Sequence, residues 1–168
     1  MTKVLDMVAI KGKEMKTAQD ILNQKARVSL FTVSPQETVK RAIKKMVGKK
    51  VGAILVEEDN SIIGIWTERD LLNNMANPGF HPETDPVRDY MSSPLKKVSH
   101  DTPIVVLEEM FLGLFIRHIL VEKDNRYIGL LSIGDVIRAS LLEKDSKIKE
   151  LNSIASWDYY EDWCWKKK

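Results

Sequence analysis

Cysteine is almost absent from this chain of 168 residues, and its single copy, Cys164, has no partner for an intramolecular disulfide or a cysteine-based zinc site. No apolar run approaches the roughly 18 residues that a membrane-spanning helix needs, and no charged-then-apolar leader precedes residue 20. Neither sign of charge dominates, since the net charge is only +2, so nothing indicates a nucleic-acid partner. These absences predict a cytoplasmic chain without a membrane or nucleic-acid partner.

Motifs of several reaction classes are also lacking. The segment Lys11-Gly12-Lys13 is a basic patch and not a phosphate-binding loop of the form Gly-x-x-x-x-Gly-Lys-Ser/Thr. The three histidines do not have the spacing of metal ligands. Ser132, His118 and Asp135 can be written down as a triad, but Asp135 lies one helical turn after Ser132. The sequence therefore predicts that the protein is not an enzyme and that it holds no metal.

What the chain does contain is an internal repeat. Residues 64–70 read Gly-Ile-Trp-Thr-Glu-Arg-Asp, and residues 129–135 read Gly-Leu-Leu-Ser-Ile-Gly-Asp, 65 positions later. The offset also relates Ile-Leu-Val-Glu at 54–57 to the same four residues at 119–122, and it holds without a gap over residues 33–72. A repeat of this length predicts two tandem small domains and not a solenoid.

Each copy predicts the order strand, helix, strand, strand, helix, and so an α/β fold. In the first copy, the apolar spacing predicts a helix that starts near Glu37, has Val47 on its buried face and ends at Gly48. The continuous apolar run from Val51 to Val56 predicts a strand that is buried on both faces. A turn at Asp59-Asn60 joins this strand to the next one.

The repeat, together with a break around Asn77-Pro78-Gly79, divides the chain into five parts. These are an N-terminal arm at 1–16, a first domain at 17–77, a linker at 78–85, a second domain at 86–143, and a C-terminal helix with an aromatic tail at 144–168. A predicted helix at 141–154 leads into the last part, which then has a cluster of aromatic residues, namely Trp157, Tyr159, Tyr160, Trp163 and Trp165. Three interpretations of this tail stay open: docking on the module or on a second subunit, contact with a membrane interface, or recognition of a target protein.

Each unit has the pattern Gly-apolar-apolar-Ser/Thr-x-x-Asp at the end of its last strand. Two units of this kind resemble the cystathionine β-synthase (CBS) domain family. The resemblance covers residues 17–143 and is strongest to the small stand-alone bacterial proteins of this family. It implies tandem CBS domains packed sheet to sheet as a pseudo-twofold Bateman module, with two modules forming a homodimer. It also implies a regulatory module that binds AMP, ADP, ATP or NAD between the domains and signals to an unknown regulated protein by a change of conformation.

The chemistry of the repeated motif fits this implied ligand. The carboxylate of Asp70 or Asp135 can accept both hydroxyls of a ribose. The hydroxyl of Thr67 or Ser132 can donate to an α-phosphate oxygen near the start of a helix, or it can merely cap that helix. The adenine would lie on apolar strand surface, where backbone groups recognise it.

The resemblance further implies that each cleft is shared between the two copies. In one cleft, Ser132 and Asp135 are joined by the strand Val51, Gly52, Ala53 and by the segment 26–31. In the other, Thr67, Arg69 and Asp70 are joined by Ile116, Arg117 and His118. Gly52 suits a place beside a ligand, because its missing side chain lets the backbone approach. The two clefts are not equivalent, since the counterpart of Arg69 is Gly134.

Some of these assignments have alternatives. Arg69 either holds a phosphate or pairs with a carboxylate across the dimer. His118 either contacts a phosphate or is structural. Trp66 either belongs to the core or an interface, or it stacks on a base. For the whole protein, the alternative is a ligand-independent interaction and dimerisation module that acts through its surface or its aromatic tail. Ligand binding is favoured because a scaffold would not need both Asp residues with Ser or Thr three positions before them.

Overall fold

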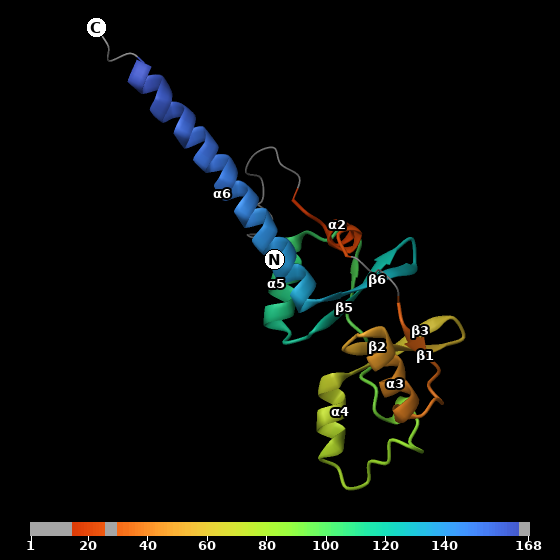
Figure 1. The fold of residues 1–168 in the computed structure, drawn as a ribbon. Coiled ribbons are helices and arrows are strands. Elements are labelled where there is room, and N and C mark those ends of the chain that lie inside the picture. Colours follow the sequence, from red (N-terminus) through yellow and green to blue (C-terminus); the bar gives the residue numbers. More distant parts are fainter. Residues whose placement is uncertain (1–14, 26–29, 165–168) are drawn as a thin grey trace.

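The computed structural model describes residues 15–25 and 30–164, with side chains as far as Asn152, and it contains two small α/β units (Figure 1). The first unit consists of β1 (Thr32–Val33), α3 (Val39–Lys49), β2 (Ala53–Glu58), β3 (Ser61–Thr67) and α4 (Glu68–Met75). The second consists of β4 (Lys97–Ser99), α5 (Ile104–Gly113), β5 (His118–Lys123), β6 (Arg126–Ser132) and α6 (Ile133–Cys164). The helix α2 (Ala18–Asn23) precedes the first unit, and the short 3-10 helix η1 (Val87–Asp89) precedes the second. The predicted class and element order are confirmed.

The two sheets have the same topology. In each, the first strand pairs in parallel with the second, and the second pairs antiparallel with the third, giving the orders β1-β2-β3 and β4-β5-β6. The hairpin turns at Asp59-Asn60 and Asp124-Asn125 have φ between 49° and 61°, the left-handed conformation that a two-residue hairpin turn needs. The predicted turn is therefore confirmed, and the repeat in the sequence is a repeat in the fold.

The end of α3 differs from the prediction. The helix continues through Gly48, and it ends where Lys50 takes a left-handed conformation with φ of 55° and donates its N–H to the carbonyls of Met46 and Val47. The predicted stop at Gly48 is wrong because the left-handed residue that closes the helix is Lys50, two positions further on.

The buried faces are largely as predicted. The strand β2 begins at Ala53, two residues after the predicted start, and its first four residues are buried. In α3 the buried positions are Val39, Ala42 and Met46, whereas 72% of Val47 is exposed. The prediction for Val47 is wrong because it lies about 100° further around the helix than Met46.

The two sheets meet on the faces that turn away from their own helices. Side chains alternate along a strand, so Ile54 and Val56 of β2 point into the core of the first unit. Leu55, between them, is also buried but belongs to neither core, and Leu120 occupies the equivalent place in β5. These residues fill the contact between the sheets, as expected for a Bateman module.

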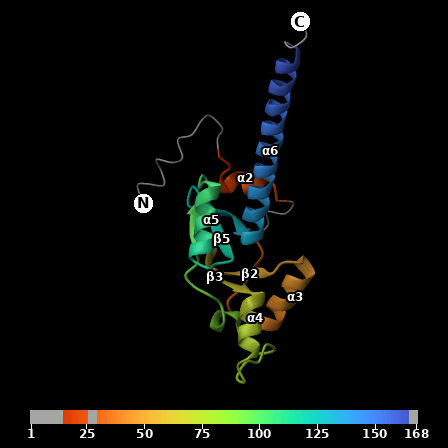
Figure 2. The ribbon, with the colours of Figure 1, turned by 90° about the vertical axis from the view of Figure 1, so that its left-hand side faces the viewer.

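Each core is completed by a segment that precedes the other copy in the sequence. The side chains of α2, although it comes before the first unit, are buried in the core of the second unit, and the N–H of Ala18 donates to the carbonyl of Thr102 at 2.9 Å. The N–H of Val87 in η1 donates to the carbonyl of Glu37 in the first unit at 2.9 Å, and Val87 is buried in that core. The two units are thus interlocked. Figure 2 shows α2 against the second unit, which is the upper one in that view.

Gly64 and Gly129, which open the two motifs, lie where these crossing segments touch the sheets. A Cβ on Gly129 would come within 2.5 Å of Leu22 Cδ2, and one on Gly64 within 2.3 Å of Met91 Sδ. A larger residue at either position would displace the crossing segment, so the glycine of the motif serves packing.

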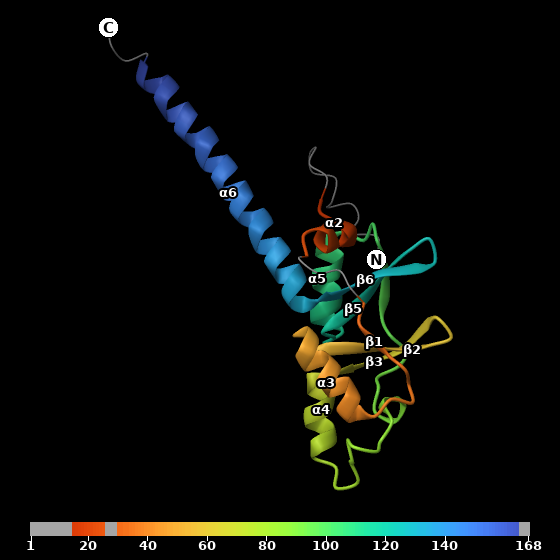
Figure 3. The same ribbon diagram turned by 45° about the vertical axis from the view of Figure 1, so that its right-hand side comes forward.

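The four helices α3 to α6 lie on one side of the molecule, and the tips of the two hairpins lie on the other (Figures 1 and 3). The first turns of α6 pack against α5 and α2, and the helix then extends away from both units to Cys164. With 32 residues it is about 48 Å long. The prediction of a separate helix at 141–154 is wrong, because no helix-breaking residue separates it from the motif helix. The aromatic side chains of the tail lie outside the described residues, so their interpretations stay predictions.

Candidate ligand-binding site

The Asp residues of both motifs lie in the first turn of a helix, held by the preceding strand end. Asp70 Oδ2 accepts hydrogen bonds from the N–H and the Oγ1–H of Thr67, at 2.9 and 2.7 Å. Asp135 Oδ2 accepts the same pair from Ser132, both at 2.7 Å. In return, the N–H of each Asp donates to the hydroxyl oxygen at 3.3 Å. Each motif is therefore a helix capping box.

The capping box does not by itself mark a ligand site. Thr17 and Asp20 form the same arrangement at the start of α2, outside both repeats. A hydroxyl has one proton, and in Thr67 and Ser132 it is donated to the carboxylate. Each must turn away from its Asp before it can donate to a phosphate. The predicted phosphate contacts of Thr67 and Ser132 stay predictions.

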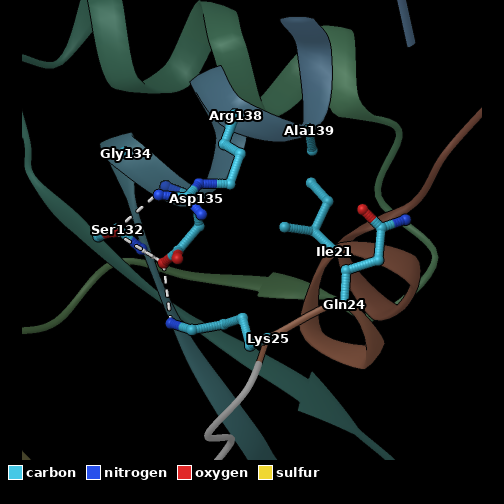
Figure 4. Close-up of a pocket in the computed structure, with 8 residues that line it drawn as sticks. All are labelled: Ile21, Gln24, Lys25, Ser132, Gly134, Asp135, Arg138 and Ala139. Atoms are coloured by element: carbon cyan, nitrogen blue, oxygen red, sulfur yellow. Dashed lines mark hydrogen bonds and ion pairs between the residues drawn. The ribbon is translucent and has the colours of Figure 1, made fainter. Parts of the chain in front are cut away.

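The Asp135 box opens into a cavity of about 480 Å³ between α2 and the start of α6 (Figure 4). The Nζ of Lys25, just after α2, donates to Asp135 Oδ2 at 2.8 Å and to the carbonyl of Leu130 at 2.9 Å. Burial alone would raise the pKa of Asp135, but the hydrogen bonds from Lys25 and from the hydroxyl and N–H of Ser132 outweigh it and lower the pKa. The carboxylate is thus charged at neutral pH, and within the described chain only its Oδ2 is engaged.

Two cationic residues of this cavity, Lys25 and Arg138, were not among the predicted site residues. Arg138 stands three positions after Asp135 and hence on the same face of α6, so helical spacing alone was enough to find it. Lys25 comes from 110 residues away, and no local pattern connects it with Asp135. The remaining lining residues are Ile21, Gln24, Ser132, Gly134 and Ala139.

The Asp70 box has different surroundings. Among the described residues, Asp70 accepts hydrogen bonds only from Thr67, and the exposed Arg69 forms no ion pair. The carboxylate of Glu68 covers Gly52: its Oε2 would lie 2.9 Å from a Cβ there, and the N–H of Glu68 donates to the Gly52 carbonyl at 3.0 Å. The space beside Gly52 that was predicted to face a ligand thus contains a side chain of the same unit.

The structure brings some predicted residues together and separates others. Val51 and Gly52 line a second hollow of about 350 Å³ between α3 and α4, whose other lining residues include Trp66 and Glu68, and neither lines the Asp135 cavity. Trp66 is fully buried in the first core. Ala53 is buried as well. Of the predicted segment 26–31, residues 26–29 lie outside the described chain.

Of the second group, Ile116 and Arg117 lie just before β5. Ile116 packs against the second core, and the exposed Arg117 accepts the N–H of Ile133 at its carbonyl, at 3.1 Å. Their predicted contact with the ligand at Asp70 stays a prediction.

His118 lies between the two motifs, beside Ser132 in the β5–β6 pair. Its pKa is lowered to about 4, first by burial and then by the positive charges of Arg117 and Lys25. Asp135 and Asp70 both act in the opposite direction, so the imidazole is close enough to both carboxylates to interact with each. At neutral pH it is uncharged and can only offer a neutral hydrogen bond to a ligand.

Ser132, His118 and Asp135 do not form a catalytic triad. A hydrolytic triad needs the imidazole between the hydroxyl and the carboxylate, whereas the Ser132 hydroxyl donates directly to Asp135. In the part of the chain that the structure describes, no three His, Cys, Asp or Glu side chains are grouped to hold a metal ion. None of the helices within that part is long and apolar enough to cross a bilayer.

Comparison with known proteins identifies the fold. The family model of the CBS domain matches residues 18–77 and 87–142, which together make up more than half of the chain. The chain belongs to the CBS domain family. Proteins of this family are generally regulatory modules that bind adenosine ligands.

This CBS-domain protein is similar to several known proteins. It is 32% identical over 156 residues to the CBS domain-containing protein CBSX3, mitochondrial, of Arabidopsis thaliana, covering 88% of this chain and 76% of the relative. The structure of a putative signal-transduction protein with CBS domains from Burkholderia ambifaria MC40-6 matches with a TM-score of 0.72 and 28% identity, over 76% of this chain and 95% of that one. The crystal structure of CBSX2 in complex with AMP matches with a TM-score of 0.61 and 26% identity, over 76% and 98%.

Proposed function

We propose that this protein is a regulatory module that binds an adenosine ligand beside Asp135 and signals its occupancy by a change of conformation. The observation that carries the proposal is the Asp135 cavity, about 480 Å³ in volume, in which a charged carboxylate has one oxygen without a partner among the described residues. That oxygen, Oδ1, is suited to accept ribose hydroxyls, and the start of α6 favours a phosphate. AMP, ADP, ATP and NAD all satisfy this chemistry, and a relative has been solved with AMP.

The position of the cavity supports a signalling role. It lies between α2, which comes first among the described elements, and α6, which comes last, so a ligand there contacts both ends of the interlocked fold. His118 lies near both Asp135 and Asp70, so a charge placed in one cleft acts on the other. A ligand signals only to the extent that it binds one arrangement of these elements better than another.

The proposal is tested by thermal unfolding of the purified protein with AMP, ADP, ATP, NAD or S-adenosylmethionine added separately. We expect one adenine ligand to raise the midpoint, because a ligand that binds only the folded state stabilises it by mass action. Asp135→Ala should weaken binding by about 2 kcal/mol or more, since it removes hydrogen bonds to a charged acceptor. Asp70→Ala shows whether the first cleft contributes.

Asp20→Ala is the matched control for this test. It removes the same kind of capping box, at a cost of about 1 kcal/mol in stability, but not the carboxylate of the cavity. The ligand-induced shift should survive in Asp20→Ala and disappear in Asp135→Ala. A dissociation constant that is unchanged in Asp135→Ala would remove this residue from the site, and no shift with any ligand would contradict the proposal.

We also propose that two modules form a homodimer through the helical side of the molecule. Exposed apolar residues occur there in pairs related by the 65-residue repeat: Val47 on α3 corresponds to Leu112 on α5, and Leu72 on α4 to Ile137 on α6. Between 51% and 73% of each of these side chains is exposed. Large exposed apolar surface is typical of a protein interface, and these four side chains come from the four helices on this side of the molecule.

A second function is favoured by the length of α6. Beyond the module this helix presents Ile148 and Leu151, each more than half exposed, and its backbone extends away from both units (Figure 1). These features suit an interaction module that recruits a partner protein without a ligand. This alternative predicts no thermal shift with any adenine ligand, and loss of partner binding when residues 157–168 are deleted.

A further inference from the structure

The charges around the Asp135 cavity do not cancel. Lys25 pairs with Asp135 at 2.8 Å, with 25% and 23% of their side chains exposed, while Arg138 lines the same cavity without a hydrogen bond or ion pair to any described residue. His118 adds no charge at neutral pH. Two cations thus face one carboxylate. In the view of Figure 4 their charged ends lie on opposite sides of that carboxylate.

We propose that Lys25 and Arg138 make the Asp135 cavity selective for a phosphorylated adenosine ligand over adenosine and S-adenosylmethionine. Lys25 moves from Asp135 to the phosphate as the ligand enters, and Arg138 supplies the second contact. This rests on the proposed function, because it specifies the ligand class of the same cavity. Adenosine leaves the guanidinium of Arg138 without a counter-charge, and S-adenosylmethionine brings a sulfonium cation, whereas a phosphate compensates the excess positive charge.

The selectivity belongs to this cavity and not to the motif in general. The residue of the first copy that corresponds to Arg138 is Asn73, and no lysine pairs with Asp70 among the described residues. Conversely, Arg69 of the first copy is replaced by Gly134 in the second. The two clefts therefore differ in where a cation stands relative to the Asp, although their capping boxes have the same geometry.

Lys25 also has a structural role, which the test must separate from selectivity. Its second hydrogen bond, to the carbonyl of Leu130, ties the end of α2 to β6. Loss of this hydrogen bond lowers the affinity for every ligand of the cavity to the same extent. Loss of a phosphate contact lowers only the affinity for nucleotides. The ratio of the dissociation constants for adenosine and AMP thus reports on the phosphate contact alone.

The experiment is calorimetric titration of the full-length protein with adenosine, AMP and S-adenosylmethionine, in the wild type and in Asp70→Ala, where the Asp135 cavity is measured alone. The variants are Arg138→Gln, at an exposed position, and Lys25→Met. The matched controls are Arg126→Gln, an exposed arginine at the other end of β6, and Lys97→Met, which breaks the 2.7 Å ion pair with Glu122.

We expect AMP to bind at least about tenfold more tightly than adenosine and S-adenosylmethionine, and both cavity variants to reduce the adenosine-to-AMP ratio by about tenfold. The controls should keep the ratio, and added salt should weaken AMP but not adenosine. Equal affinities for adenosine and AMP, or an unchanged ratio in Arg138→Gln, would overturn this inference and leave the proposed function standing. Absence of binding by every adenine ligand would overturn both.

Discussion

At the scale of single residues, His118 shows how burial and nearby charges control ionisation. Burial and the cations Arg117 and Lys25 lower its pKa from 6.5 to about 4, although two carboxylates lie near enough to oppose them. Between pH 6.5 and pH 4, the unfolded chain therefore binds a proton at His118 and the folded protein does not. The contribution of neutral His118 to the free energy of unfolding is fully present above pH 6.5, and it is lost as the pH falls toward 4.

This behaviour gives a prediction for the pH dependence of stability. The free energy of unfolding should fall by up to about 3 kcal/mol between pH 6.5 and pH 4, and His118→Gln should remove most of that decrease. Denaturant unfolding at a series of pH values measures it. His81→Gln, at an exposed histidine, is the control and should keep most of the decrease. The same steep loss in His118→Gln would show that other groups cause it.

At the scale of elements, the crossing segments, namely α2 and residues 87–92, determine which positions of the sheets must be glycine. Leu22 packs on Gly129 and Met91 on Gly64, so the same position of each copy is covered by a segment from outside that copy. The first glycine of the repeated motif thus serves the interlock, whereas the Asp serves the helix start and, in the second copy, the cavity.

Gly129→Ala should destabilise the protein by about 1–3 kcal/mol, because the added methyl group overlaps the buried side chain of Leu22. The matched control is Gly48→Ala in α3, where a Cβ meets nothing within 4 Å and should stabilise the helix by about 0.5–1 kcal/mol. Chemical denaturation measures both. Combining Gly129→Ala with Leu22→Ala should cost less than the sum of the single changes, and strict additivity would contradict the proposed overlap.

Local patterns in the sequence predicted most of the fold but only part of the site. The turn at Asp59-Asn60 and the buried strand β2 follow from residues that are neighbours in the chain. The end of α3 was misplaced because Lys50 adopts an uncommon left-handed conformation that its residue type does not favour. Lys25 was missed because its pairing with Asp135 depends on how α2 crosses to the other unit, which no local spacing encodes.

At the scale of the whole molecule, the repeat places exposed apolar residues at equivalent positions of helices α3 to α6, on the helical side. Leu72→Glu and Leu112→Glu should each convert the proposed dimer to a monomer, because a charge in an apolar interface is not compensated. Sedimentation velocity measures the change. Leu151→Glu, on the projecting part of α6, is the control. Dissociation caused only by Leu151→Glu would show that the subunits associate through α6.

The interlock also has a consequence for the synthesis of the chain. The helix α2 emerges from the ribosome early, yet Lys25 at its end pairs with a residue 110 positions later. The first unit can close as soon as residues 80–91 have been made, since they complete its core. The apolar side of α2, in contrast, packs in the core of the second unit, which is complete only when β6 and the start of α6 exist. The cavity beside Asp135 consequently cannot form before the start of α6 has been made, and a nascent chain that stops before α6 lacks it.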